Sequence, residues 1–424
     1  MRSGRLLGLL VAAAIAACGC KVVETRKNGA LVLPDPNSNL PAQSSGSQTK
    51  VTIKAAATIP YDGFTLPLLS PDGRYIATQT GVPPTWSTLL GTPAGGPPRA
   101  SGIEVWSLED RGGRRSFTLP KGYVLSRSAD ASGFLIEAPQ TDGSRRIGRV
   151  RWPVTATADE PDPEGTSTLS PEWIVKDGRV NIYPVLGPDD AMAWCVRGVQ
   201  ETDFSLVVRR GDESFEIPAE DGQSWMLPSF ASDGSIFALR VRDGVTELVH
   251  ARTEDEAAFN QSMTAERLSV RCDAQRAWQA LAPLDASSAV DPGPTARLLL
   301  LDLDLSRMAL WNPSDEGIQP LAPDSFAACF GDDGTILWTD SDGVTATPPV
   351  TNMPTTRPAK GSGATARPEL RMNGPRVYDR AAVPRRVAGD PRTWMLLVPD
   401  GRMMGIVRLT LLTPPVVVGP AQAR

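Results

Sequence analysis

The sequence predicts an all-β protein assembled from repeated small sheets, and three observations support this fold class. Glycine and proline are abundant, with 38 and 39 residues in a chain of 424, which is typical of a protein rich in turns. Short runs in which apolar and polar residues alternate occur along the chain, and such runs predict strands with one buried face. A short motif, in which a small residue is followed by Asp and Gly, also recurs with substitutions; it is called a phrase below.

The first copy of this phrase is LLSPDGRYIATQT, residues 68–80, in which a turn separates an apolar stretch from an alternating run. Asp starts the bend and Gly adopts a positive φ, so each phrase predicts a β-hairpin. The further copies are SRSADASGFLIEA (126–138), PVLGPDDAMAWCV (184–196), SFASDGSIFALRV (229–241) and ACFGDDGTILWTD (328–340).

More strand-like runs follow each hairpin, which predicts four short antiparallel strands per repeat. In the first repeat, the third and fourth strands are expected at IEVWSL (103–108) and RSFTLP (115–120). Two less regular repeats, 276–311 and 389–412, fill the gaps, so the turns recur about every 44 to 59 residues. The pattern predicts a β-propeller of seven blades, with six also compatible. Near-regular spacing argues against the alternative of two stacked β-sandwich domains.

Ring closure predicts a role for the segment VTIKAAATIP, residues 51–60, which precedes the first repeat. We expect it to form the outer strand of the last blade, because closing the ring removes open sheet edges. The propeller is therefore expected over residues 51–415, with a short tail at 416–424.

The repeated phrases resemble the Ser-Pro-Asp-Gly-x-x-apolar-Ala repeat of TolB-like propellers, a WD-like repeat fold also found as the propeller of prolyl-oligopeptidase-like enzymes. The best match is Ser70-Pro71-Asp72-Gly73-Arg74-Tyr75-Ile76-Ala77, followed by residues 232–238. The resemblance covers about residues 55 to 415. It implies the fold and carries over no catalytic residue.

The N-terminus has the organisation of a bacterial export signal. Two arginines precede the twelve-residue apolar run 6–17, which is too short to span a bilayer as a mature helix but suits a signal-peptide core. The run ends in Ile15-Ala16-Ala17-Cys18, which resembles the lipobox of bacterial lipoproteins. The resemblance implies that residues 1–17 are removed and that Cys18 receives diacylglycerol. An ordinary secretory signal is the alternative.

Lipidation of Cys18 predicts an extracytoplasmic protein anchored to a bacterial membrane, with the inner and outer membranes both open. Residues 18–50 are rich in Pro, Asn, Ser and Gln, which predicts a flexible tether that reaches roughly 30 Å. The net charge of −5 provides no basic field, so nucleic acid is not expected as a partner.

Long loops are the expected contact regions for a protein or glycan of the cell envelope, because such loops commonly carry function. They span 81–102, 153–171 and 349–375, and the last has the composition of a disordered insertion. Trp86 in the first loop is the candidate for stacking on a sugar, whereas most of the other tryptophans are expected to pack between blades.

The region 357–392 is basic, with nine Lys and Arg against three Asp and Glu. A solvated loop explains this charge, and contact with an anionic glycan, lipid headgroups or an acidic partner is the functional interpretation. The candidate residues are Arg357, Lys360, Arg367 and Arg371.

Catalytic chemistry has little support in the sequence. The single histidine, His250, lies in a predicted strand, and neither a Gly-x-Ser-x-Gly elbow nor a phosphate-binding loop occurs. We therefore predict no catalytic residue, cofactor or metal. The alternative is a propeller lyase or hydrolase that uses channel carboxylates, for which Asp302 and Asp304 are candidates because they share one side of a strand.

Three cysteines remain, Cys195, Cys272 and Cys329. They are expected as buried thiols, and the alternative is one disulfide with an odd thiol. The sequence does not identify the pair.

Overall fold

The computed structural model is all-β in the part that it describes. The described residues are 49–61, 67–80, 102–108, 116–153, 167–219, 222–232, 234–242, 245–251, 268–271, 278–280, 297–302, 307–312, 317–321, 325–349, 374–400 and 403–415. Within these ranges the one helix is a single 3-10 turn, Pro188–Asp190. No described helix has the length and hydropathy needed to cross a bilayer.

The strands form antiparallel groups of four that follow one another along the chain, and a parallel bridge joins the second and third groups into one eight-stranded sheet. The first group is β2 (Leu68–Leu69), β3 (Tyr75–Thr80), β4 (Gly102–Ser107) and β5 (Ser116–Thr118). The second is β6 (Val124–Ala129), β7 (Gly133–Pro139), β8 (Arg145–Arg151) and β10 (Glu172–Val175). The third is β11 (Val180–Leu186), β12 (Met192–Arg197), β13 (Ser205–Arg210) and β14 (Glu213–Ile217).

The later groups repeat this order. They are β15 (Gln223–Phe230), β16 (Ile236–Arg242), β17 (Val245–Ala251) and β18 (Leu268–Arg271); β19 (Trp278–Ala280), β20 (Leu298–Asp302), β21 (Arg307–Asn312) and β22 (Gly317–Pro320); and β23 (Ala327–Phe330), β24 (Ile336–Asp340), β25 (Gly343–Thr347) and β26 (Arg376–Tyr378). The final sheet contains β27 (Val383–Arg386), β28 (Thr393–Asp400), β29 (Met403–Leu411) and β1 (Val51–Pro60).

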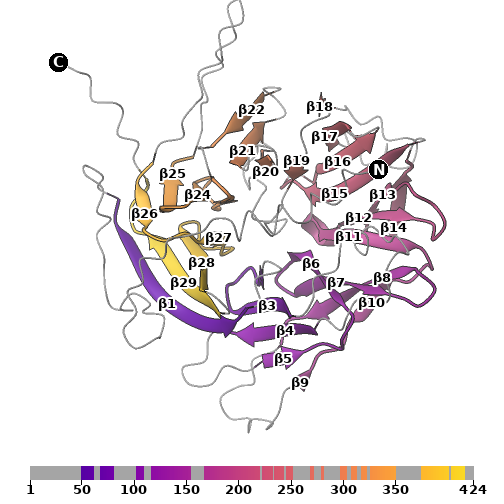
Figure 1. Cartoon of the computed structure of the whole chain (residues 1–424), viewed down its shortest axis with the longest axis horizontal. Coiled ribbons are helices and arrows are strands. Elements are labelled where there is room, and N and C mark those ends of the chain that lie inside the picture. Colours follow the sequence, from indigo (N-terminus) through magenta and orange to yellow (C-terminus); the bar gives the residue numbers. More distant parts are fainter. Residues whose placement is uncertain are drawn as a thin grey trace, which may run out of the picture.

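The groups stand around a common centre, with β6, β11 and β27 toward the middle and β1 and β5 at the periphery (Figure 1). This arrangement of consecutive antiparallel sheets is that of a β-propeller. The predicted fold class is therefore confirmed at the level of an all-β propeller.

The segment 51–60 forms β1, as the sequence predicted, and it pairs with β29 in the final sheet. Nine residue pairs join the two strands, from Val51 opposite Leu411 to Pro60 opposite Met403. The pairing continues beyond the strands, because Leu412 N–H donates to the Lys50 carbonyl and Lys50 N–H donates to Thr413 Oγ1. The two ends of the described chain thus close the ring together.

The apolar core lies between neighbouring sheets. One cluster joins Leu68 and Ile103 of the first group to Phe134 and Val150 of the second. Burial in such clusters stabilises the fold by about 25 cal/mol per Å² of apolar surface removed from water. A group of four strands cannot bury its own apolar face, so each sheet covers the apolar face of its neighbour.

The Ser-Pro-Asp-Gly phrase folds into a hydrogen-bonded turn. The Ser70 hydroxyl donates to Asp72 Oδ1 at 2.6 Å and accepts the N–H of Tyr75 at 2.9 Å. Gly73 has φ of 72°, a left-handed conformation that costs other residues energy. The sequence therefore assigned this hairpin correctly, including the residue types that form the turn.

Replacing Ser70 by Ala leaves the buried N–H of Tyr75 without its acceptor. We expect a loss of about 1–3 kcal/mol in the free energy of unfolding, the usual cost of an unsatisfied buried group. Urea denaturation measures this loss. Ser341→Ala is the control in an exposed turn and should change stability by less than about 0.5 kcal/mol. Equal stability of the two variants would contradict the role assigned to Ser70.

The hairpin turns define one face of the ring, here named the turn face. It carries the turns between the first and second strands of successive sheets, such as Ser70–Gly73 and Ala231–Gly234. Neighbouring turns touch across sheet boundaries, since Ala388 N–H donates to the Pro71 carbonyl and Arg210 donates to the Gly234 carbonyl. Because consecutive strands are antiparallel, β1 begins at the turn face.

The same reasoning shows at which face of the ring each of the three long loops begins and ends. β8 ends and β10 begins at the turn face, as do the end of β25 and the start of β26, so the loops 153–171 and 349–375 start and end there. The loop 81–102 joins strand ends at the opposite face. Within the loop 153–171, β9 (Ser167–Thr168) pairs in parallel with β5 and covers the edge of the first sheet.

Candidate functional site

Three neighbouring first strands share an internal irregularity. The strand register shifts between Leu125 and Ala129 in β6, between Ile182 and Val185 in β11, and between Met226 and Ser229 in β15. We call these segments, 125–129, 182–185 and 226–229, the bulge arc. Bulges re-aim side chains and are over-represented beside active sites.

Backbone strain accompanies two of the three bulges. Tyr183 has φ of 54° and Leu227 has φ of 51°. A left-handed conformation costs a residue with a side chain about 1–2 kcal/mol, and it persists only where the surroundings hold it in place. Each of the two residues precedes a proline, Pro184 or Pro228, at the same distance from its turn.

A buried ion pair holds the bulge of β11. Glu137 on β7 is 4% exposed and Arg145 on β8 is 3% exposed. Arg145 Nη1 donates to Glu137 Oε2 at 2.9 Å, and the N–H of Tyr183 donates to the other carboxylate oxygen at 2.9 Å. Burial raises the pKa of Glu137, although Arg145, the Tyr183 N–H and Arg127 each oppose this shift. The carboxylate of the second group thus fixes the backbone of the third.

The side chain of Tyr183 is half-buried and lies against Arg127, whose guanidinium is 6.0 Å from the ring centroid. Its hydroxyl is buried and makes no hydrogen bond with any residue that the structure describes. Burial, with a smaller contribution from Glu137, raises the pKa of Tyr183. The phenol is therefore protonated at neutral pH and has a hydrogen bond to donate.

Cys195 on β12 also lies beside the bulge arc. Its thiol is buried, and a main-chain hydrogen bond from Leu227 reaches the sulfur. Burial raises the pKa of Cys195, while Arg127 and Leu227 oppose the shift. The thiol is therefore uncharged and poorly nucleophilic at neutral pH.

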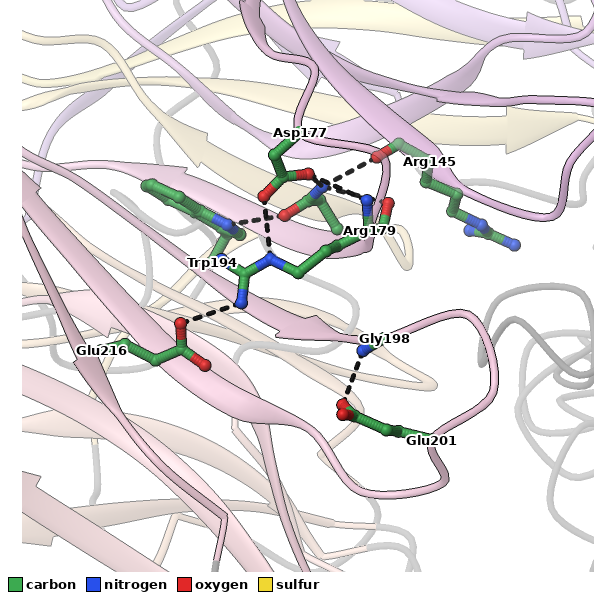
Figure 2. A network of polar contacts seen from close by, with 8 residues as sticks. Arg145, Asp177, Arg179, Trp194, Gly198, Glu201 and Glu216 are labelled. Carbon is green, nitrogen blue, oxygen red and sulfur yellow. Dashed lines mark hydrogen bonds and ion pairs between the residues drawn. The ribbon is translucent and has the colours of Figure 1, made fainter.

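A second polar cluster includes the main chain of Arg145 and lies where β11 begins, at the end opposite its turn (Figure 2). The Asn181 amide donates to the Arg145 carbonyl and to Asp177 Oδ1, and its oxygen accepts the indole N–H of Trp194. Arg179 joins Asp177 to Glu216 through ion pairs of 3.0 and 2.9 Å. These contacts tie the connection between the second and third groups to the outer strand β14.

Asp177, an acid of this cluster, is held in its charged form. Burial by itself raises the pKa of Asp177, but hydrogen bonds from Asn181 and Arg179 outweigh burial, so the pKa is lowered. Nearby, Glu201 Oε2 accepts the N–H of Gly198 at 2.7 Å (Figure 2). These hydrogen bonds and ion pairs fix the positions of the charged side chains in this part of the face.

Most of the residues predicted from the sequence lie outside the described residues, as do all of 1–48. These are Cys18, Trp86, Cys272, Asp304, Arg357, Lys360, Arg367 and Arg371. Asp302 ends β20, the second strand of its sheet, opposite Trp278 and Arg307. His250 lies in β17 as expected, opposite Phe237 and Leu268. No predicted binding residue falls in the bulge arc.

The interpretation of the tryptophans as packing residues is confirmed where their side chains are described. Five of the seven described are buried, namely Trp152, Trp194, Trp225, Trp338 and Trp394, and the half-buried Trp106 and Trp173 pack against core clusters. Cys195 and Cys329 are buried and form no disulfide, so neither makes the bond considered as an alternative.

The sequence analysis missed Glu137, Arg127 and Tyr183, although one signal was available. Proline interrupts the first strand of two consecutive repeats, at Pro184 and Pro228. Proline inside a strand indicates a bulge or an edge. This signal locates the bulge, whereas the partners of Tyr183 depend on packing between sheets.

No protein-family model matches the chain, and no curated protein matches it. Among solved structures, a puromycin-hydrolyzing peptidase from Mycobacterium tuberculosis is similar with 14% identity and a TM-score of 0.43, over 80% of this chain and 52% of that one. Prolyl oligopeptidase B from Galerina marginata has 12% identity and a TM-score of 0.39, over 72% of this chain and 41% of that one. TolB from Acinetobacter baumannii has 10% identity and a TM-score of 0.37, over 81% of this chain and 65% of that one.

The match thus covers about half the length of the puromycin-hydrolyzing peptidase and less than half of prolyl oligopeptidase B. Its own strand order and ring closure identify it as a β-propeller.

Proposed function

We propose that the protein is a lipid-anchored, extracytoplasmic β-propeller that binds a protein or glycan of the cell envelope. We further propose that the ring has seven blades. The eight-stranded sheet contains two groups of four that are joined by a single parallel bridge between Val180 and Arg145, so it counts as two blades.

The observation that carries this proposal is the position of the chain ends. Lys50 and Leu412 pair with each other at the turn face, where β1 begins. A tether over residues 18–50 therefore reaches the ring from this side. The opposite face, with its paired cluster around Asp177 and Arg179, is then the side directed away from the anchor and toward a partner.

Crosslinking in the cell envelope tests which face docks. Photoreactive residues placed at Asp142, an exposed position at the opposite face, and at Asp189, an exposed position in a turn, form a matched pair. The proposal expects a crosslinked partner from position 142 and little from position 189. Equal yields, or no partner above background from either position, would overturn it.

Lipidation is tested on the mature N-terminus. Cys18→Ser should remove the acyl mass and release the protein from the membrane fraction, because the thiol that takes the lipid is lost. Cys20→Ser is the control, and this variant should keep the acyl mass and remain in the membrane fraction. Mass spectrometry of the mature protein reads the result directly. An unmodified N-terminus in the wild type would rule out the anchor.

A propeller lyase or hydrolase is the second candidate, supported by one observation. Glu137 is buried and its pKa is raised, which is the behaviour expected of a general acid. Wild-type protein on a panel of glycans and peptides tests this candidate, with Glu137→Gln, Asp302→Asn and Asp304→Asn as variants. Inactivity of the wild type on the whole panel would eliminate it.

A further inference from the structure

The bulge arc contains more polar capacity than the protein itself uses. The Tyr183 hydroxyl and Ser229 Oγ are both buried without a hydrogen-bond partner among the described residues, and they belong to the bulges of two adjacent first strands. Buried polar groups are paired in most proteins, so orphaned ones require an explanation. A strained backbone at the same positions requires one as well.

We infer that the bulge arc is a binding site for an oxyanion, either a carboxylate or a phosphate, whose oxygen accepts the hydrogen bond of the Tyr183 hydroxyl. The inference does not depend on the lipid anchor or on a docking partner. It assigns to the first strands a ligand that neither the sequence motifs nor the loops indicated.

The chemistry of the groups at Tyr183 selects an acceptor. The phenol is held in its protonated form, so it donates. The guanidinium of Arg127 lies on the same ring and also provides only donors. The nearby carboxylate, Glu137, already accepts from Arg145 and from the Tyr183 N–H with its two oxygens. The Tyr183 hydroxyl therefore remains as a donor at this position while the local acceptor is occupied.

The ion pair has a positioning role in this arrangement. By accepting the N–H of Tyr183, Glu137 holds the left-handed backbone that directs the ring toward Arg127. The site is thereby preorganised before any ligand arrives, which reduces the entropic cost of binding.

Thermal denaturation of the full chain with inorganic phosphate or succinate tests the inference, with sodium chloride at matched ionic strength as the reference. A ligand that binds only the folded state raises the Tm in a concentration-dependent manner. We expect a rise with one of the two anions beyond the chloride reference. A response to phosphate alone or to succinate alone identifies the class of oxyanion.

Two conservative variants make the test specific. Tyr183→Phe should weaken the binding of the effective anion by about tenfold, the usual effect of losing one hydrogen bond to a charged group. Tyr378→Phe is the matched control, because the Tyr378 hydroxyl is also buried without a partner but lies in β26, outside the bulge arc. Both variants should fold, since each loses a hydroxyl that makes no hydrogen bond within the described part of the chain.

Three outcomes would overturn the inference. The first is a wild type whose Tm responds to neither anion beyond chloride. The second is a Tyr183→Phe variant that binds as tightly as the wild type. The third is an equal loss in Tyr378→Phe, which would indicate a general effect of removing phenols rather than a site.

Discussion

Placing charges on the buried side of β1 is expected to open the ring. Ile53 is 4% exposed and Ile59 is fully buried, and both contribute to the core where the last sheet meets its neighbours. In the double variant Ile53→Asp/Ile59→Asp, lost apolar burial alone removes about 3–6 kcal/mol, a large share of the stability of a typical domain. Desolvation of the new carboxylates adds to this loss.

The matched control places the same charges on the exposed side of the same strand. Lys54 and Ala56 are exposed, so Lys54→Asp/Ala56→Asp adds two carboxylates to β1 without entering the core. Urea denaturation compares the two variants, and size-exclusion chromatography reports association through the uncovered edge of β29. If both variants unfold at the same urea concentration, β1 is not the closing strand in solution.

Breaking the buried ion pair is the second large effect expected. Glu137→Gln leaves the guanidinium of Arg145 charged and without its carboxylate, in a position that is 3% exposed. Removing one partner of such a pair typically costs 3–5 kcal/mol, about the effect that we expect here. The free energy of unfolding from urea titration measures it.

The double variant Glu137→Leu/Arg145→Met tests whether the ion pair adds to the free energy of unfolding when it is compared with apolar side chains. Replacing both charges with apolar side chains removes the desolvation cost together with the attraction, so the double variant should recover most of the loss. A double variant as unstable as Glu137→Gln would show instead that the carboxylate is needed to hold the Tyr183 backbone.

The same double variant isolates the pH dependence of Glu137. Its pKa is raised in the folded state, so the folded protein binds this proton more tightly than the unfolded chain. The penalty for the buried carboxylate applies above the folded pKa and disappears as the pH falls through that value toward the unfolded one. The wild type should therefore gain stability relative to the double variant on acidification, and a relative loss would contradict the direction of the shift.

Local chemistry explains which parts of the fold were readable in the sequence. The Ser70–Gly73 turn depends on residues within five positions of one another, and the alternating runs report directly which strand face is buried. The role of residues 51–60 followed from the need to cover an open edge. The structure confirmed these assignments because each depends on short-range geometry or on a general property of closed sheets.

Only the tertiary structure brought the residues of the bulge arc together. Glu137 and Tyr183 are 46 positions apart and meet because two sheets pack side by side. A lone Glu in an alternating strand has the same local pattern whether it faces water or a buried arginine. The sequence by itself thus determined the repeated hairpins and their closure, because turn chemistry and side-chain alternation are local. The packing between sheets decided where charges are buried and which hydroxyl lacks a partner.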